Sequence, residues 1–196
     1  VVENSSPEYV PFIFSCKKEK AANIEESVSK QKLFTSVSAK ETGVDFINVL
    51  EETIDANYFQ YNYMYIGGGV ASGDINNDGL VDLFFTSNSN ENKLYLNKGD
   101  FKFEDITKEA GIPHEKGFDT GVNFVDINND GFIDIYISRG GWLDKANKFA
   151  NQLFINNGDL TFSEKAVEFG LADANRTIQT LFFDYDNDND LDAYVT

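Results

Sequence analysis

A nine-residue acidic loop followed by a strand-like run occurs three times along the chain, and this repeat constrains the fold more than any other feature. The copies begin at Asp74, Asp126 and Asp184 and read DINNDGLVD, DINNDGFID and DYDNDNDLD. Their starts are 52 and 58 residues apart. A unit of this length that recurs at a nearly fixed period is typical of solenoids and propellers, in which each repeat is one supersecondary unit.

The aligned units cover residues 67–112 and 121–171, with an incomplete third unit at 178–196. Each complete unit holds four short alternating or apolar runs rich in Val, Ile, Phe and Tyr, which predict strands. Asn-Gly turn signals at 97–100 and 156–159 predict hairpins. The sequence therefore predicts an all-β fold, a β-propeller of four-stranded antiparallel blades. A β-sandwich also has alternating strands, but it gives no reason to repeat one loop between the same two strands.

The ends of the predicted propeller do not close within this sequence. Residues 33–44 (LFTSVSAKETGV) parallel residues 101–112 (FKFEDITKEAGI), so we expect an isolated outer strand that completes the last blade. The third unit ends after its second strand, which gives about two and a half blades where a propeller has 4 to 8. We therefore expect a fragment of a longer protein, with a partial propeller at 33–196 and a signal-like or tether segment at 1–32.

The acidic loops have the ligand pattern of a calcium site. Oxygen side chains at positions one, three and five turn inward, a main-chain carbonyl serves at position seven, and a carboxylate at position nine can complete the 6 to 8 oxygen ligands of Ca²⁺. The absence of His and Cys from the loops excludes zinc and copper sites. The predicted ligands are Asp74, Asn76, Asp78, Leu80 (carbonyl) and Asp82; Asp126, Asn128, Asp130, Phe132 (carbonyl) and Asp134; and Asp184, Asp186, Asp188, Asp190 (carbonyl) and Asp192.

Position six of each loop must bend sharply, and Gly79 and Gly131 suit that bend better than Asn189 in the third loop. An EF-hand needs a bidentate Glu at position twelve, whereas these loops have Phe, Ile and Val there. A charged surface turn without a metal is the alternative interpretation.

Charge and composition limit the classes of binding partner and the kind of membrane attachment that the chain can have. The chain has 33 acidic and 16 basic residues, for a net charge of -17, and this makes nucleic acid an unexpected partner because phosphate binding needs clustered Lys and Arg. No stretch approaches the ~20 apolar residues of a membrane span. The sequence around Cys16, YVPFIFSCKKEK, is similar to the end of a bacterial lipoprotein signal peptide. Acylation of Cys16, with a lipid anchor in the outer membrane, and an ordinary thiol both stay open.

The repeats resemble the FG-GAP and VCBS repeats of integrin-α-like propellers. Residues 33–196 are similar to the N-terminal part of bacterial surface proteins that join such a propeller to an ASPIC/UnbV domain, and to the cartilage acidic protein family. The resemblance implies a seven-bladed ring, calcium in the acidic loops, and a secreted or cell-surface location.

No catalytic constellation is visible, since His114 is the only histidine and no Gly-x-Ser-x-Gly elbow occurs. We therefore expect a calcium-binding module in cell adhesion or ligand binding and not an enzyme. The alternative is the non-catalytic propeller of a larger secreted enzyme that acts on polysaccharides. The ligand, a protein or a carbohydrate, is not identified by the sequence.

The connection at 138–151 is longer than its counterpart at 87–92 and carries the only tryptophan. Binding residues concentrate on loops held by a rigid scaffold, and Trp and Arg are enriched where binding energy concentrates. We therefore predict ligand binding by Arg139 and Trp142. Packing of Trp142 as core is the alternative.

Overall fold

The structure is a computed structural model, and it describes residues 33–55, 57–113, 117–140 and 149–196. From Ser36 to the last residue the chain forms one compact unit. Within the described ranges, no helix is long and apolar enough to cross a bilayer. Cys16, His114 and Trp142 lie outside the described residues.

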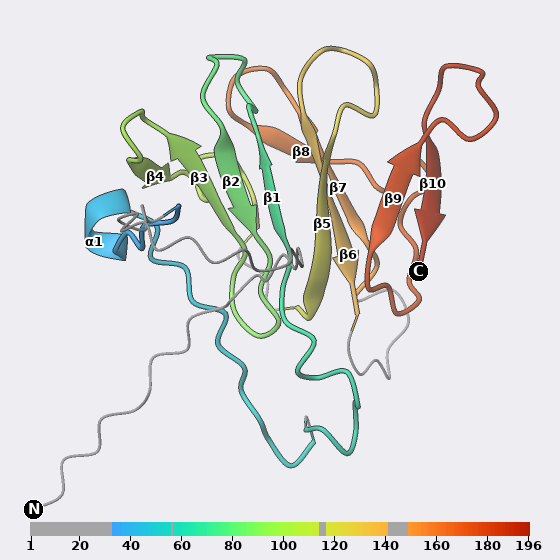
Figure 1. Cartoon of the computed structure of the whole chain (residues 1–196). Coiled ribbons are helices and arrows are strands. Elements are labelled where there is room, and N and C mark those ends of the chain that lie inside the picture. Colours follow the sequence, from blue (N-terminus) through green and yellow to red (C-terminus); the bar gives the residue numbers. More distant parts are fainter. Residues whose placement is uncertain (1–32, 56, 114–116, 141–148) are drawn as a thin grey trace, which may run out of the picture. The chain divides into compact units, whose positions relative to one another are not determined.

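The described residues form three antiparallel sheets whose strands follow the order of the sequence (Figure 1). The first sheet contains β1 (Val70–Gly73), β2 (Asp82–Phe85), β3 (Lys93–Asn97) and β4 (Phe103–Asp105). The second contains β5 (Asp119–Val125), β6 (Asp134–Arg139), β7 (Gln152–Asn156) and β8 (Phe162–Glu164), and β9 (Thr180–Phe183) pairs with β10 (Asp192–Val195). The predicted all-β class with four-stranded antiparallel blades is confirmed.

The first two blades pack face to face, because each strand places alternate side chains on the face that meets its neighbour. Phe84 and Leu94 of the first blade and Ile135 of the second have no exposed surface, and they belong to one apolar cluster that joins both blades. The innermost strands approach so closely that a Cβ on Gly69 would lie 2.7 Å from the Thr120 carbonyl oxygen. Blade-to-blade contact is therefore the main source of the core.

A tight turn follows each outer strand and contacts the next blade. The turn after β4 ends at Gly111 with φ 77°, and Phe162 of β8 donates its N–H to the Ala110 carbonyl at 2.9 Å. The short helix α1 (Ala39–Thr42) ends at Gly43 with φ 84°, where a Cβ would lie only 2.3 Å from the Phe103 carbonyl oxygen. The α1 turn thus lies against the first blade as the turn after β4 lies against the second.

The outer strand expected at the start of residues 33–44 would pair with the third strand of the last blade, which is not among the described residues, so it stays a prediction. Residues 33–38 have no strand, and α1 follows them. An outer strand requires a third strand as its hydrogen-bonding partner, and no strand of the described residues pairs with this segment. The sequence parallel with residues 101–112 is therefore matched in the turn, where Gly43 and Gly111 are both left-handed, while the strand has no partner among the described residues.

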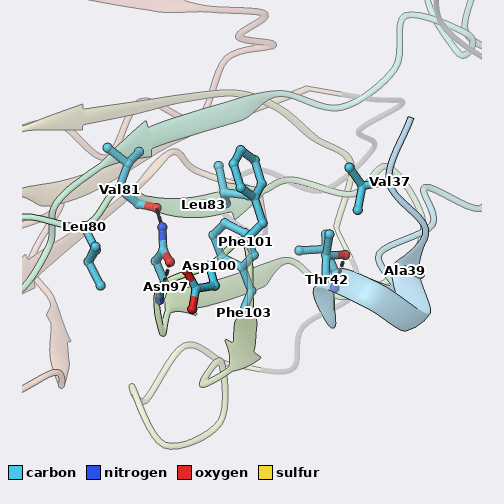
Figure 2. Close-up of a pocket in the computed structure, with 12 residues that line it drawn as sticks. Val37, Ala39, Thr42, Leu80, Val81, Leu83, Asn97, Asp100, Phe101 and Phe103 are labelled. Carbon is cyan, nitrogen blue, oxygen red and sulfur yellow. Dashed lines mark hydrogen bonds between the residues drawn. The ribbon is translucent and has the colours of Figure 1, made fainter. Parts of the chain in front are cut away.

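A groove of about 640 Å³ lies between α1 and the first blade (Figure 2). Val81 and Phe101, which line it, are 51% and 74% exposed. Their counterparts in the second blade, Ile133 and Leu160, pack against the apolar cluster that joins the two blades. The groove is therefore the first blade's version of a surface that the second blade buries against its neighbour.

Candidate metal centre

The three acidic loops join the first two strands of each sheet and lie at the same end of the blades, at the top of Figure 1. In each loop the carboxylate at position one accepts the N–H groups of positions five and six, so that the backbone wraps around it. The acceptors are Asp74 (from Asp78 at 3.1 Å and Gly79 at 2.7 Å), Asp126 (from Asp130 at 3.0 Å and Gly131 at 2.9 Å) and Asp184 (from Asp188 and Asn189, both at 3.2 Å).

Two positions of each loop have left-handed backbone. Position six was expected to do so, and Gly79, Gly131 and Asn189 have φ of 86°, 88° and 72°. Position four was not expected from the sequence, yet Asn77, Asn129 and Asn187 have φ of 59°, 58° and 64°. The signal was present, because asparagine occupies position four in every copy and tolerates this conformation better than most residues.

Side-chain oxygens from positions one, three and five come together. In the third loop, carboxylate oxygens of Asp184, Asp186 and Asp188 lie within 4.8 Å of one another, the one such group of three among the described residues. The Asp188 carboxylate raises the pKa of Asp190, first by accepting a hydrogen bond from the protonated Asp190 carboxyl and then by its negative charge. Such crowding of carboxylates is what a divalent cation would relieve.

The first and second loops have asparagine at position three, so one oxygen ligand there is neutral. The Asn76 amide donates to Asp78 Oδ2 at 3.0 Å, and the Asn128 amide donates to Asp130 Oδ2 at 2.8 Å. These amides bring positions three and five together in the same way in both loops. At position seven, the N–H groups of Leu80, Phe132 and Asp190 donate to the position-five carboxylate at 2.8, 2.8 and 3.1 Å.

The aspartate at position nine holds the loop to the sheet. Asp82 is fully buried, and it accepts the N–H of Ile75 at 3.0 Å and that of Asn97 in β3 at 2.7 Å. Asp134 repeats this arrangement at 3.0 and 2.8 Å. Burial raises the pKa of both carboxyls. Each carboxylate oxygen of Asp82 and Asp134 keeps a second lone pair, so these residues can bind calcium while they accept the two backbone hydrogen bonds.

Hydrogen bonds also join the first loop to the second blade. The Asn77 amide in the first loop donates to the Gly131 carbonyl in the second at 3.0 Å. The buried Asn156 amide of β7 donates to the Ile75 carbonyl at 2.8 Å, while the Asn156 backbone N–H binds Asp134. A bond network therefore runs from position nine of one loop to position two of the other.

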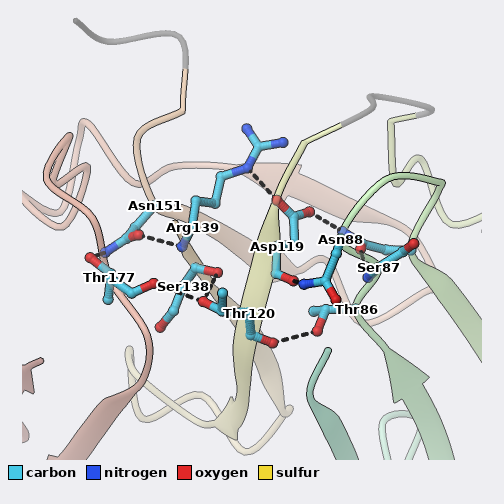
Figure 3. A network of polar contacts seen from close by, with 10 residues as sticks. Thr86, Ser87, Asn88, Asp119, Thr120, Ser138, Arg139, Asn151 and Thr177 are labelled. Atoms are coloured by element: carbon cyan, nitrogen blue, oxygen red, sulfur yellow. Dashed lines mark hydrogen bonds and ion pairs between the residues drawn. The ribbon is translucent and has the colours of Figure 1, made fainter. Parts of the chain in front are cut away.

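At the opposite end of the blades, Arg139 is only 3% exposed and lies in a polar network between the sheets (Figure 3). Its Nε lies 2.7 Å from Asp119 Oδ1, and the Asn92 amide donates to Asp119 Oδ2 at 2.6 Å. The structure thus gives Arg139 a packing role, and ligand binding by Arg139 stays a prediction. Asp119, Asn92 and Asn151 were not singled out from the sequence, because no local pattern marks a residue that pairs across blades.

The sheets and their acidic loops define a repeat protein of the β-propeller type, and comparison with known proteins agrees. Residues 74–137 match the FG-GAP-like repeat family. The chain is 33% identical over 135 residues to cartilage acidic protein 1 of Xenopus tropicalis, across 66% of this chain and 20% of that protein. Residues 74–137 therefore carry an FG-GAP-like repeat, and the chain spans about a fifth of the length of this relative.

Proposed function

We propose that the chain is the calcium-binding part of a β-propeller that acts outside the cell as a binding or adhesion module. The observation that carries the proposal is the repeated loop geometry, in which the same backbone donors surround the first carboxylate in three copies. A turn that only presents charge to water has no need to reproduce the same internal bonds in each copy.

The calcium ion would have a structural role here. The side chains at positions one, three, five and nine and the carbonyl at position seven would hold it, and the ion would supply positive charge among carboxylates that otherwise repel one another. Position nine would connect the ion to the sheet, because Asp82 and Asp134 already bond to the third strand of their blades. Calcium would thereby stabilise the blade and its contact with the next one.

Binding, and not catalysis, is the activity that these residues support best. The densest carboxylates hold the loop backbone, so they are poorly placed to move protons. Similarity to cartilage acidic protein 1, over a fifth of its length, supports an extracellular location. Attachment through an acylated Cys16 is part of the proposal, and the ligand is a protein or a carbohydrate.

The test is a calcium titration of the full-length protein, followed by calorimetry and by thermal unfolding. A ligand that binds only the folded state stabilises it by ~2.7 kcal/mol per site at a hundredfold excess over Kd. We expect a higher melting temperature in calcium than in chelator. The variant Asp126→Asn with Asp130→Asn should lose one bound ion, whereas Glu104→Gln on the exposed strand β4 should lose none. Equal melting temperatures in calcium and chelator would overturn the proposal.

A further inference from the structure

The connection that enters the first blade is much longer than the others, and it is called here the aromatic loop (residues 45–66). The corresponding connections into the second and third blades are residues 113–118 and 172–176. The aromatic loop lies below the sheets in Figure 1, at the end of the blades opposite the acidic loops. It contains six aromatic residues, namely Phe46, Tyr58, Phe59, Tyr61, Tyr63 and Tyr65.

One side of the aromatic loop is anchored to the blades. Tyr61 and Met64 are buried, at 3% and 0% exposure, and they cluster with Phe118, which precedes β5. The Asn57 amide donates to the Thr53 and Ile54 carbonyls at 3.1 and 2.8 Å, which closes the turn. The loop is therefore held in a defined conformation by its own buried side and by local hydrogen bonds.

The other side of the aromatic loop presents rings to solvent. Phe59, Tyr63 and Tyr65 are 93%, 60% and 63% exposed, and Tyr58 is 48% exposed. The Tyr58 and Tyr65 rings stack at 6.0 Å between centroids, and Phe59 meets Tyr58 edge-on at 6.2 Å. Val81 and Phe101 of the groove beside α1 are also exposed, but their counterparts Ile133 and Leu160 pack on the apolar cluster. The connections at 113–118 and 172–176 are, by sequence, too short to hold an equivalent of the aromatic loop.

The aromatic loop itself carries only negative charge. Residues 41–92 contain no Lys, Arg or His, while Glu51, Glu52 and Asp55 of the aromatic loop are exposed. The Tyr65 hydroxyl donates to Glu52 Oε1, so one carboxylate lies at the edge of the stacked pair. Ring faces beside a carboxylate are a site for ammonium or guanidinium groups, which are attracted by the ring quadrupole and by the negative charge.

The chain already contains one example of this contact. The guanidinium of Arg176, from the connection into the third blade, lies 5.5 Å from the centroid of the Tyr61 ring. A neutral polysaccharide could stack on the same rings and donate hydrogen bonds from its hydroxyls, but it would gain no charge attraction from the three exposed carboxylates. The geometry and the charge together favour a cationic occupant.

We propose that the exposed rings of the aromatic loop bind a Lys- or Arg-rich segment of a partner protein. A cationic side chain stacks on Tyr58 and Tyr65 and pairs with Glu52, and Phe59 covers its aliphatic stem. This inference names the partner class for the binding role proposed above and depends on that role, but it does not depend on calcium in the acidic loops.

The experiment measures binding of a fluorescent peptide of alternating Arg and Gly to the full-length protein at physiological salt. Tyr58→Ala with Phe59→Ala removes ring faces and no charge, and Glu52→Gln removes one charge and no ring. Each contact of this kind contributes about a 2- to 5-fold change in affinity, so we expect roughly a 10-fold loss for the double variant. The matched controls are Val167→Ala, an exposed apolar residue, and Glu104→Gln, an exposed acid, and neither should change the affinity.

Non-specific attraction to an acidic protein would be insensitive to removal of the rings. Unchanged peptide affinity in the double variant would therefore overturn the proposal, as would ring-dependent binding of a neutral β-glucan oligosaccharide in place of the peptide. Melting curves of each variant show that the fold is intact. Calcium titration of the same samples separates the two proposals, because a wild-type protein that binds calcium but not the peptide contradicts only the partner class.

Discussion

The two ends of the blades differ in how faithfully the repeat is kept. The end with the acidic loops repeats three features with the same hydrogen bonds or backbone angle: the carboxylate at position one, the left-handed Asn at position four and the buried aspartate at position nine. At the opposite end, Arg139 of the second blade occupies the position that Ser87 has in the first blade. The connections that enter the blades also differ in length, from residues 172–176 to the much longer aromatic loop. The repeated end carries the acidic loops, whereas the variable end carries both the buried Arg139 network between the blades and the exposed aromatic loop.

The largest loss of stability is expected when Arg139, at the variable end, is replaced. Its ion pair with Asp119 is 4% and 2% exposed at the two side chains. Removing one partner of a buried pair leaves the other charge uncompensated, at a cost of about 3–5 kcal/mol. We therefore expect Arg139→Ala to lower the free energy of unfolding by that amount, as measured by urea denaturation of the full-length protein.

A paired replacement is the control for Arg139→Ala. Replacing both partners, as in Arg139→Met with Asp119→Asn, removes both charges and should recover much of the lost stability, because a buried pair often contributes little relative to uncharged residues. If Arg139→Ala left the protein as stable as wild type, the network at this end would not hold the blades together.

The next effect concerns the bonds between blades at the acidic-loop end. Asn156 and Asn97 occupy equivalent positions and both accept the N–H of a turn glycine, but only Asn156 also reaches across to Ile75 of the neighbouring blade. Leaving a buried acceptor without its donor costs about 1–3 kcal/mol. Asn156→Ala should therefore destabilise the protein more than Asn97→Ala, by a difference of about this size in chemical denaturation.

Calcium affinity of the first loop provides a second measurement on the same pair of variants. If the contact from Asn156 to Ile75 positions the first loop, Asn156→Ala should weaken calcium binding there, although Asn156 lies in the second blade. Equal stability losses in the two variants would mean that the bond between blades contributes nothing measurable.

The sequence predicted the acidic loops and strands well because their signals are local. Alternation and β-branched residues mark strands, and the spacing of oxygen side chains marks the loop. The pairing of Arg139 with Asp119 could not be predicted in this way, since it depends on which faces meet across blades. The outer strand predicted at the start of residues 33–44 depends on a distant partner in the same way, because a segment with strand-like sequence forms a strand only beside another strand.

The smallest effect is expected at position six, where the third loop has asparagine and the other two loops have glycine. Asn189 has φ of 72° where the first two loops have glycine, and an L-residue pays a steric cost in this region that glycine avoids. Asn189→Gly should relieve that cost and raise the stability of the calcium-free protein by about 0.5 kcal/mol, partly offset by the greater freedom of glycine in the unfolded chain. The reverse change, Gly131→Asn, should lower stability by a similar amount. Differential scanning calorimetry of both variants measures the two shifts, and shifts of the same sign would show that position six is not under the same backbone constraint in the second and third loops.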